Sequence, residues 1–443
     1  MIIRNCRIAY PAGISEFSVA FGEESGIIEE VGPSLRSYGG EEYDAGGALL
    51  LPGLIDVHCH LRDPGFTSKE DFLTGTTAAL AGGVTTIFDM PNTLPATTTM
   101  QALAQKAAEA SAKAVCDYGL VFGAAPGNGA EAMAAAPQVA AKKIFIGGTT
   151  SADALAPDAV AGHFNYPKPV MVHAEDAAVI AECESRYRES LGSSTTAAMH
   201  NNIRPPEAAV KAVELAISLA EKARCQLHVC HASTASELEL ISAAKARGIN
   251  VSCEVTPHHL FLDESACDLF GNFAKVNPPL RSKADCAALW QGIAAGTVDI
   301  IASDHAPHLA SEKHADYWQA PSGVPGLETT LPLLLDAVSA GRLPIGKVVE
   351  LCCLNPAKKF GLRHKGRVEK GFDADFVLVD LDGTTVIDDS SLQTKCGWSP
   401  FDGRRLQGAI KAVFLRGRLV KEGELIVAKP GTGMNLFEPH AVA

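Results

Sequence analysis

Residues 53–60 read Gly-Leu-Ile-Asp-Val-His-Cys-His, an apolar run that ends in two histidines. Side chains two positions apart lie on the same face of a β-strand, so His58 and His60 are predicted to point the same way. A single histidine is more often a buried structural residue, whereas two imidazoles at one strand end can bind a metal ion together. The pattern therefore predicts a strand with a metal site at its carboxyl end.

Seven similar apolar runs follow, and Ala-rich helical stretches separate them. The eight predicted strands are 53–57, 84–90, 118–122, 143–146, 170–172, 226–230, 250–254 and 298–302. Strands that are apolar throughout and alternate with helices are typical of a parallel sheet covered on both faces. Eight such units predict an α/β fold, a (β/α)8 TIM-like barrel, in which the carboxyl ends of the strands meet at one mouth.

Helix signals agree with this alternation. Pro206 is predicted to begin a helix that runs to about Ala223, and Thr234-Ala-Ser-Glu237 is a capping box at the start of the next helix. The Ala-rich stretches 101–115 and 130–142 are predicted helices. Residues 310–326, which are polar and contain proline and glycine, are predicted to form a loop over the site.

Both ends of the chain differ from the middle, because they read as short β-strands separated by turns. We predict a small β-sandwich domain built from both termini, with residues 1–50 as its first part and 365–443 as its second. Residues 51–364 are then the catalytic barrel.

The composition is that of a folded, acidic protein. The 443 residues are 47% hydrophobic and 20% charged, which excludes disorder as the main state. The formal net charge of -13 argues against nucleic acid or an anionic membrane as a partner, since both require a basic face. The 12 cysteines form no CxxC framework, and neither a membrane-spanning run nor a secretion signal is apparent, so we predict a cytoplasmic protein.

Three later strands are also followed by residues that can bind metals. These residues are His173, His231 and Asp304, and the mouth of a barrel would bring them close to His58 and His60. Neutral imidazoles and a carboxylate suit zinc or a similar divalent ion. Four histidines and one aspartate exceed the needs of one catalytic metal with an open position, so we predict two metal ions.

Two neighbouring metal ions need a bridging anion, and Lys143 is the candidate. It begins an apolar strand, where an exposed lysine is unexpected. Burial favours a neutral amine, which can attack CO2 to give an N-carboxylate with one oxygen for each metal. The alternative is that Lys143, beside Lys142, extends its ammonium group to solvent at the edge of the strand.

Several motifs resemble those of dihydroorotases in the amidohydrolase superfamily, and together they span essentially the whole chain. Two of them, HLRDPG and MPNT, are fairly specific, whereas HxH marks only the superfamily. The matching segments are 52–65, 90–93, 253–260, 277–281, 303–308, 326–329 and 371–375.

The resemblance implies a binuclear zinc centre. The first metal would be bound by His58, His60 and Asp304, the second by His173 and His231, and carboxylated Lys143 would bridge them. Some bacterial relatives instead place an aspartate near this position. The next aspartate in this chain is Asp153, so that alternative bridge stays open.

The resemblance also implies a reaction and a substrate. The reaction is the reversible hydrolysis of dihydroorotate to N-carbamoyl-L-aspartate in pyrimidine biosynthesis. Two metal ions would lower the pKa of a shared water, and Asp304 would take its proton and give it to the departing ring nitrogen. The substrate carboxylate would be held by Arg62, Asn92 and His308, and the ring would be contacted by Asn277, Pro325 and Gly326. The alternative for Arg62 is a surface ion pair with Asp63 or Glu70.

Two other functions stay open. The substrate could be allantoin, a hydantoin or a dihydropyrimidine, but these rings lack the carboxylate that Arg62 and Asn92 would hold. The chain could also be a catalytically silent subunit that scaffolds aspartate transcarbamoylase, although every expected ligand position is filled. A homodimer is the expected assembly, because two-fold symmetry is the most common.

Overall fold

The predicted barrel is present in the computed structural model, which describes residues 1–33, 35, 40–148, 155 and 157–437. Eight parallel strands pair in sequence order around it. They are β6 (Leu54–Cys59), β7 (Val84–Asp89), β8 (Asp117–Gly123), β9 (Ala141–Phe145), β10 (Val170–His173), β11 (Leu227–Val229), β12 (Val251–Val255) and β13 (Ile300–Ile301). A bridge between Cys59 and His305 nearly closes the barrel, and the N–H of His60 donates to the carbonyl of His305 at 2.8 Å.

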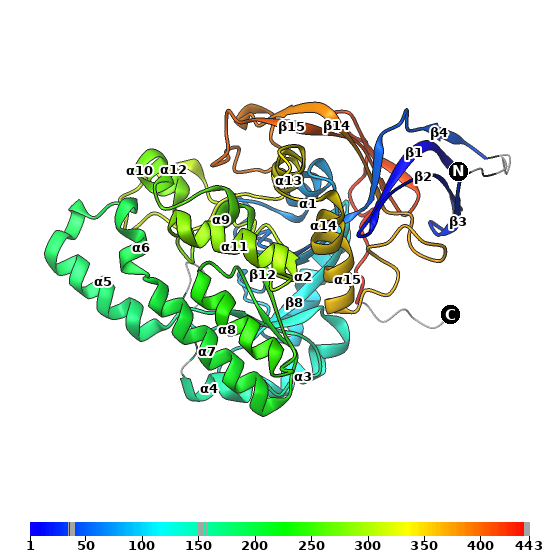
Figure 1. Cartoon of the computed structure of the whole chain (residues 1–443). Coiled ribbons are helices and arrows are strands. Elements are labelled where there is room, and N and C mark those ends of the chain that lie inside the picture. The colour runs from blue at the N-terminus through cyan, green and yellow to red at the C-terminus, as the bar shows by residue number, and fades with distance from the viewer. Residues whose placement is uncertain (34, 36–39, 149–154, 156, 438–443) are drawn as a thin grey trace.

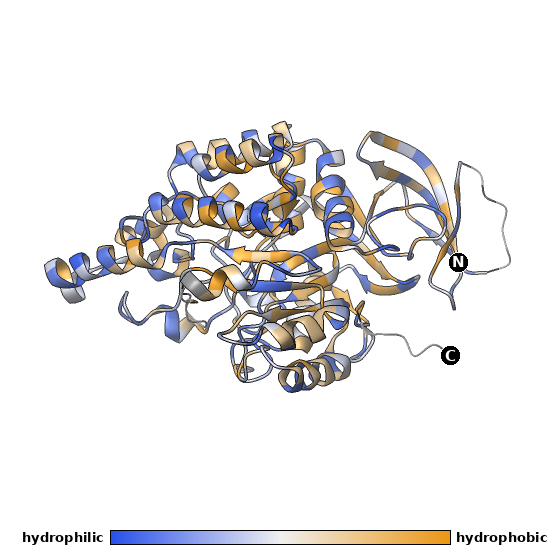
Figure 2. Ribbon diagram, turned by 90° about the horizontal axis from the view of Figure 1, so that it is seen from below, coloured by the Kyte–Doolittle hydropathy of each residue, from blue (hydrophilic) through white to orange (hydrophobic). Residues whose placement is uncertain are grey.

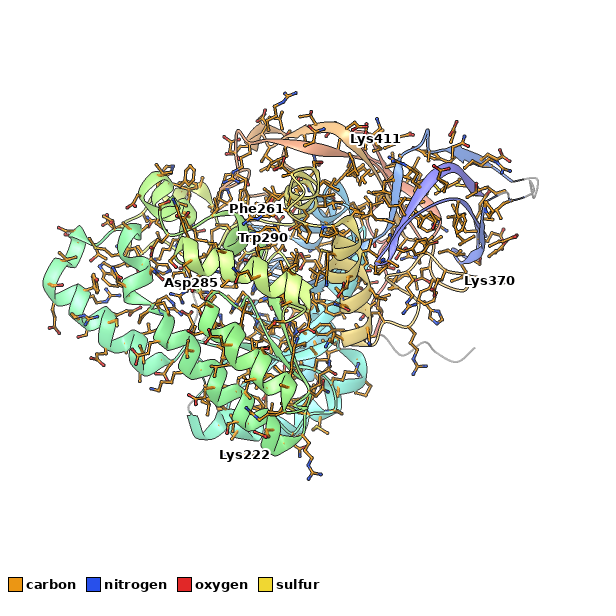
Figure 3. The ribbon with its side chains drawn as sticks, viewed as in Figure 1. Lys222, Phe261, Asp285, Trp290, Lys370 and Lys411 are labelled. Atoms are coloured by element: carbon orange, nitrogen blue, oxygen red, sulfur yellow. The ribbon has the colours of Figure 1, made fainter. Side chains whose placement is uncertain are left out.

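Helices surround these strands, and their ribbons carry both hydrophobic and hydrophilic bands (Figure 2). The helices that follow the first four barrel strands include α1 (Phe72–Ala81), α2 (Met100–Lys113), α3 (Gly129–Ala135) and α4 (Pro157–Gly162). The later barrel helices are α5 (Ala177–Leu191), α6 (His200–Ile203), α7 (Pro206–Ala223), α8 (Ala235–Ala246), α9 (Pro257–Phe261), α10 (Ala266–Phe270), α11 (Lys283–Ala295), α12 (Ala310–Lys313), α13 (Thr330–Ser339), α14 (Ile345–Val349) and α15 (Asn355–Phe360). Neighbouring helices pack through apolar side chains, as where Phe261 of α9 meets Trp290 of α11 edge-on with ring centroids 5.4 Å apart (Figure 3).

The helix signals in the sequence are largely confirmed. The helix α7 has the predicted ends, and Thr234 caps α8 through the predicted box with Glu237. The prediction for 130–142 was wrong at its C-terminal end. Pro137 ends α3 in a short 3-10 turn, and β9 begins at Ala141, because alanine supports either state and the strand is set by its neighbours in the barrel.

The strand β6 brings both signature histidines into the barrel through an irregularity. Ile55 and Val57 belong to the apolar cluster inside the barrel, whereas Cys59 packs in the cluster between strands and helices. Strict alternation after Val57 would therefore direct Cys59 inward. The register with β7 shifts between Asp56 and Cys59, and His58 and His60 line the interior cavity instead.

The flanking domain is built from both termini, as predicted, and lies beside the barrel (Figure 1). Its strands form one nine-stranded sheet. They are β1 (Ile2–Tyr10), β2 (Gly13–Phe21), β3 (Ile28–Gly32), β4 (Glu42–Asp44), β5 (Leu49–Pro52), β14 (Phe376–Val386), β15 (Arg405–Leu415), β16 (Arg418–Glu422) and β17 (Leu425–Ile426). The sheet curls onto itself. Two strands separate β2 from β14 in the sheet, yet the ring centroids of Phe21 and Phe376 lie 5.6 Å apart. The two halves of the sheet thus enclose a sandwich-like core.

Two segments after β14 reach back to the barrel. Residues 387–404, between β14 and β15, reach the barrel mouth, where Trp398 Nε1 donates to the carbonyl of His308 at 2.8 Å. At the opposite end, the carbonyl of Met434 accepts from the N–H of Tyr118 at 2.9 Å. The bounds 1–50, 51–364 and 365–443 stay a proposal, and these contacts cross between the proposed domains. No helix among the described residues is long and apolar enough to cross a membrane.

Candidate active site

The predicted metal ligands and three of the six predicted substrate residues line one cavity at the barrel mouth, whereas His308, Pro325 and Gly326 do not line it. The strands deliver the metal ligands there because the carboxyl ends of parallel barrel strands meet at one face. The cavity is lined by His58, His60, Arg62, Asn92, Lys143, Phe145, His173, His231, Asn277, Asp304, Ala306, Ser322 and Gly323. All six predicted metal ligands are among them, although they come from five different strand ends.

The first predicted metal group is compact. Asp304 Oδ1 lies 3.1 Å from His60 Nε2 and 3.3 Å from His58 Nε2. One ligand atom from each of the three residues lies within 4.8 Å of the others. Two imidazoles and a carboxylate at this spacing form a donor set that suits zinc.

The second predicted group is a pair of histidines. The Nδ1 atom of His173 lies 3.0 Å from Nε2 of His231, and both side chains are buried. The Nδ1 atom of His231 has no hydrogen-bond partner within the described part of the chain. The two ring nitrogens that face each other are the pair that could coordinate one cation.

Lys143 lies between the two groups. Its side chain is fully buried, with Nζ 3.3 Å from His58 Nε2 and 3.0 Å from Cys230 Sγ. The alternative in which this amine reaches solvent at the strand edge is therefore wrong. Lys142 points the other way, to the ring of Tyr166. Asp153, the alternative bridge, lies outside the described residues.

Outer carboxylates, which are not among the residues predicted from the sequence, orient the predicted ligands. Glu254 of β12 contacts His58 Nδ1, and its other oxygen lies 3.0 Å from His228 Nε2. Glu175 lies 3.1 Å from His173 Nε2 and is paired with a guanidinium, that of Arg204. Such partners fix the ring orientation of metal-binding histidines. The feature of the sequence that could have indicated these carboxylates is an acidic residue within or beside an apolar strand.

Asn92 acts on the ring of the other signature histidine. Its Oδ1 atom lies 2.6 Å from His60 Nδ1, so the amide oxygen accepts a hydrogen bond from the ring N–H. This contact leaves His60 Nε2 facing Asp304. Asn92 is also a predicted contact of the substrate carboxylate. Its place in the cavity lining leaves the amide nitrogen for that role, which stays a prediction.

Most of the imidazoles in the site are neutral, which is the form that binds metals. Burial lowers the pKa of His60 to about 3, although Asp304 opposes it. Burial likewise lowers the pKa of His173, and it lowers the pKa of His231 well below its usual range. A neutral imidazole keeps a ring-nitrogen lone pair, which can coordinate a metal cation.

His58 differs from the other three. Burial and Lys143 lower its pKa, but Glu254 and Asp304 outweigh them and raise it to about 10. Burial opposes the charge on Asp304, yet His58 and His60 hold the pKa of this carboxyl well below its usual range. The two carboxylates on either side of His58 therefore favour a positive charge at this position. Together with the histidine pair, they make the donor set fit divalent metal ions.

Three residues of the site have a left-handed backbone. The φ angles are 62° at Arg62, 37° at His231 and 46° at Asp304. Non-glycine residues adopt this region at a cost of about 1–3 kcal/mol each, and such residues cluster at functional sites. Each of the three follows a barrel strand, so the turn redirects its side chain to the mouth.

Arg62 is buried rather than paired at the surface. Its guanidinium contacts the carbonyl of Pro307 at 3.2 Å and His308 Nε2 at 3.1 Å. The two acids of the alternative interpretation have other partners, since Asp63 pairs with Lys113 and Glu70 contacts His305. That alternative is wrong, because the positive φ turns Arg62 into the cavity.

The predicted loop over the site consists of α12 and the irregular segment that follows. Its Ser322 and Gly323 line the cavity, whereas Pro325 and Gly326 line a second cavity beside it. A buried amine fixes this loop, since Lys313 Nζ donates to the carbonyl of Gly323 at 2.9 Å. Asn277 lines the main cavity, and its Oδ1 is 2.9 Å from His200 Nε2; its contact with the substrate ring stays a prediction.

Comparison with known proteins places these features in a family. Residues 49–420 match the amidohydrolase family. A dihydroorotase of Halobacterium salinarum is 41% identical over 387 residues, which cover 86% of this chain and 88% of that protein. An allantoinase of Rubrobacter xylanophilus is 38% identical over 420 residues, 92% of each chain. The solved L-hydantoinase (dihydropyrimidinase) of Arthrobacter aurescens matches 98% of both chains with a TM-score of 0.93 at 30% identity.

Proposed function

The chain belongs to the amidohydrolase family, and from that premise we propose that it catalyses the dihydroorotase reaction, the reversible hydrolysis of dihydroorotate to N-carbamoyl-L-aspartate. The observation that carries this proposal is the position of Arg62 and His308, 3.1 Å apart beside the cavity that holds the histidines. A guanidinium binds a carboxylate through two parallel hydrogen bonds. Dihydroorotate has a carboxylate, whereas a hydantoin, allantoin or dihydropyrimidine ring does not.

The proposed cofactor is a pair of zinc ions. His58, His60 and Asp304 would hold one ion, and His173 and His231 the other. Lys143, as its CO2-derived carbamate, would bridge the two. The support is the full burial of Lys143 beside His58, together with a donor set of imidazoles and one carboxylate.

Bound metal ions would supply a water of lowered pKa and a Lewis acid for the ring amide carbonyl. Asp304 is then the residue that moves the proton. Its carboxylate accepts the proton of the attacking water and delivers it to the ring nitrogen as the C–N bond breaks. Because His58 and His60 hold its pKa below the usual range, this carboxylate is ionised before the proton transfer.

The remaining residues hold the substrate. Arg62 and His308 would bind its carboxylate, and Asn92 would add an amide donor from the end of β7. Asn277 and the backbone of the loop near Ser322 would contact the ring. Pro325 and Gly326 would support that loop from the adjacent cavity.

A substrate panel with metal analysis of the same sample tests the proposal. Purified protein should turn over dihydroorotate and N-carbamoyl-L-aspartate faster than allantoin, hydantoin or dihydrouracil, and should contain about two zinc ions per chain. Greater activity on allantoin or hydantoin would instead support the function of the allantoinase and hydantoinase relatives. A metal-free and inactive preparation would support a silent scaffold for aspartate transcarbamoylase.

The proposal extends to the setting of the enzyme. Twelve free cysteines, eleven of them buried, support a reducing compartment such as the cytoplasm. A homodimer is supported by the prevalence of two-fold symmetry, and light scattering would test it. Association with aspartate transcarbamoylase is supported by shared chemistry, since that enzyme would supply N-carbamoyl-L-aspartate. Co-purification of the two proteins tests it.

A further inference from the structure

His308 lies between two cations at the edge of the candidate active site. Its Nε2 atom is 3.1 Å from Arg62 Nη2, and its Nδ1 atom is 3.2 Å from Lys69 Nζ. Lys69 in turn pairs with Glu312, whose Oε1 lies 2.8 Å from Nζ. The imidazole is 1% exposed and the Lys69 side chain 17%, so both groups are largely removed from solvent.

The contacts around His308 distinguish its two neutral tautomers, each of which has one N–H donor and one acceptor nitrogen. Nδ1 faces the ammonium of Lys69, which can only donate. Glu312 Oε2, at 3.8 Å from Nδ1, is too far away to accept a hydrogen bond. Nε2 lies 3.1 Å from the carbonyl oxygen of Ser322, which can only accept. The contacts therefore favour Nδ1 as the acceptor and Nε2–H as the donor.

This tautomer determines what Arg62 can bind. A protonated Nε2 cannot accept a hydrogen bond from the guanidinium 3.1 Å away, so Arg62 Nη2 and His308 Nε2 are two neighbouring donors. In this structure the Nε2–H faces the Ser322 carbonyl, and a bound carboxylate would share that proton. Burial, and after it Arg62, lowers the pKa of His308 to about 3, so the ring does not become an imidazolium. Two adjacent donors match the two oxygens of a carboxylate.

We propose that Lys69 is a positioning residue that fixes His308 in the Nε2–H tautomer, so that Arg62 and His308 present paired donors to the carboxylate of the substrate. The identity of that substrate rests on the proposed function, but the tautomer does not. The backbone of His308 is fixed separately, because its carbonyl accepts from Trp398 Nε1 at 2.8 Å. Removal of the Lys69 charge should therefore shift the ring proton from Nε2 towards Nδ1 and leave the backbone in place.

The first test needs no activity. Nitrogen-15 NMR of protein with labelled histidine distinguishes the two tautomers, and a His308→Gln spectrum identifies the signal. Wild type and Lys69→Arg should show the Nε2–H form, whereas Lys69→Met should shift His308 towards the Nδ1–H form. Lys370→Met, which changes an exposed lysine on the flanking domain, should match wild type (Figure 3). An Nδ1–H form in wild type, or an unchanged ring in Lys69→Met, would overturn the inference.

The second test separates substrate binding from turnover. Lys69→Met should raise KM for dihydroorotate about tenfold, which corresponds to ~1.4 kcal/mol, and should leave kcat within about twofold. Dihydrouracil lacks the carboxylate, so its KM should not change, and Lys69→Arg should restore KM for dihydroorotate. An equal rise in KM for both rings would contradict a role in carboxylate binding. A wild type that turns over no dihydroorotate refutes the proposed function instead, while the NMR result still decides the tautomer.

Discussion

The carboxylate of Glu254 contacts Nδ1 of His58 at the base of the cavity, and both side chains are almost completely buried. Glu254 also accepts the backbone N–H of His231 at 3.2 Å, so one carboxylate orients a residue from each predicted metal group. This contact leaves His58 Nε2 facing Asp304 and Lys143. The two halves of the site are therefore coupled through a residue that is not itself a predicted ligand.

Glu254→Gln should weaken metal binding while the fold is kept. Loss of such an outer partner typically lowers metal affinity about 10–100-fold. Competition with a chelator, followed by metal analysis, measures the effect. Glu239→Gln, an exposed change on α8, should bind metal as wild type does. Equal affinity in the two variants would exclude an orienting role for Glu254.

Lys143→Ala should lose metal and activity together, because the proposed bridge disappears. The adjacent residue provides a matched control, since Lys142 points out of the barrel to the Tyr166 ring, 4.0 Å from its Nζ. Lys142→Met should therefore keep its metal content. Short carboxylic acids added to Lys143→Ala should restore part of the activity, because they supply the missing bridging oxygens. Full metal content in Lys143→Ala would show that another group bridges the ions.

Asp304→Ala should abolish turnover while the substrate still binds. General acid–base catalysis contributes roughly 10²–10⁴-fold, so kcat should fall by at least about a hundredfold. Metal content is measured on the same sample, because Asp304 is also a proposed ligand. Asp316→Asn, an exposed change in the nearby loop, is the control. Turnover within about tenfold of wild type would be incompatible with the proposed proton transfer.

Lys365→Met should destabilise the protein without changing the active site. Lys365 Nζ lies 2.6–2.8 Å from the carboxylates of Asp117, Asp373 and Asp375, at the end of the barrel away from the mouth. Loss of one partner of a buried ion pair typically costs about 3–5 kcal/mol, and Arg416 still pairs with Asp117 in this variant. Urea unfolding measures the loss, with Lys358→Met, an exposed change, as the control. A midpoint equal to that of the control would contradict a structural role for the cluster.

The order of elements in the barrel could be predicted from the sequence because the signal is local. A buried parallel strand is apolar throughout, and helices of recognisable pattern separate the eight runs from one another. The error at 130–142 arose where that signal is weakest, because alanine indicates a helix without defining its end.

The candidate site was predictable to the extent that its residues follow strands. His173, His231 and Asp304 stand directly after apolar runs, so the geometry of a barrel places them at one mouth. Lys69 and Trp398 carry no such signal, because one lies in a loop and the other is in a segment of the flanking domain. Lys69 lies 239 residues from His308 in the sequence, and Trp398 lies 90 residues from it. A local sequence pattern cannot indicate contacts between residues so far apart.

By itself, the sequence determined which side chains reach the mouth, because strand periodicity and strand ends are properties of neighbouring residues. Only the tertiary structure decided what those side chains can do. It placed Lys143 inside the barrel, turned His58 inward at an irregularity in β6 and set Glu254 against it. The physical reason is that burial and electrostatic interaction depend on distances between strands that are far apart in the chain.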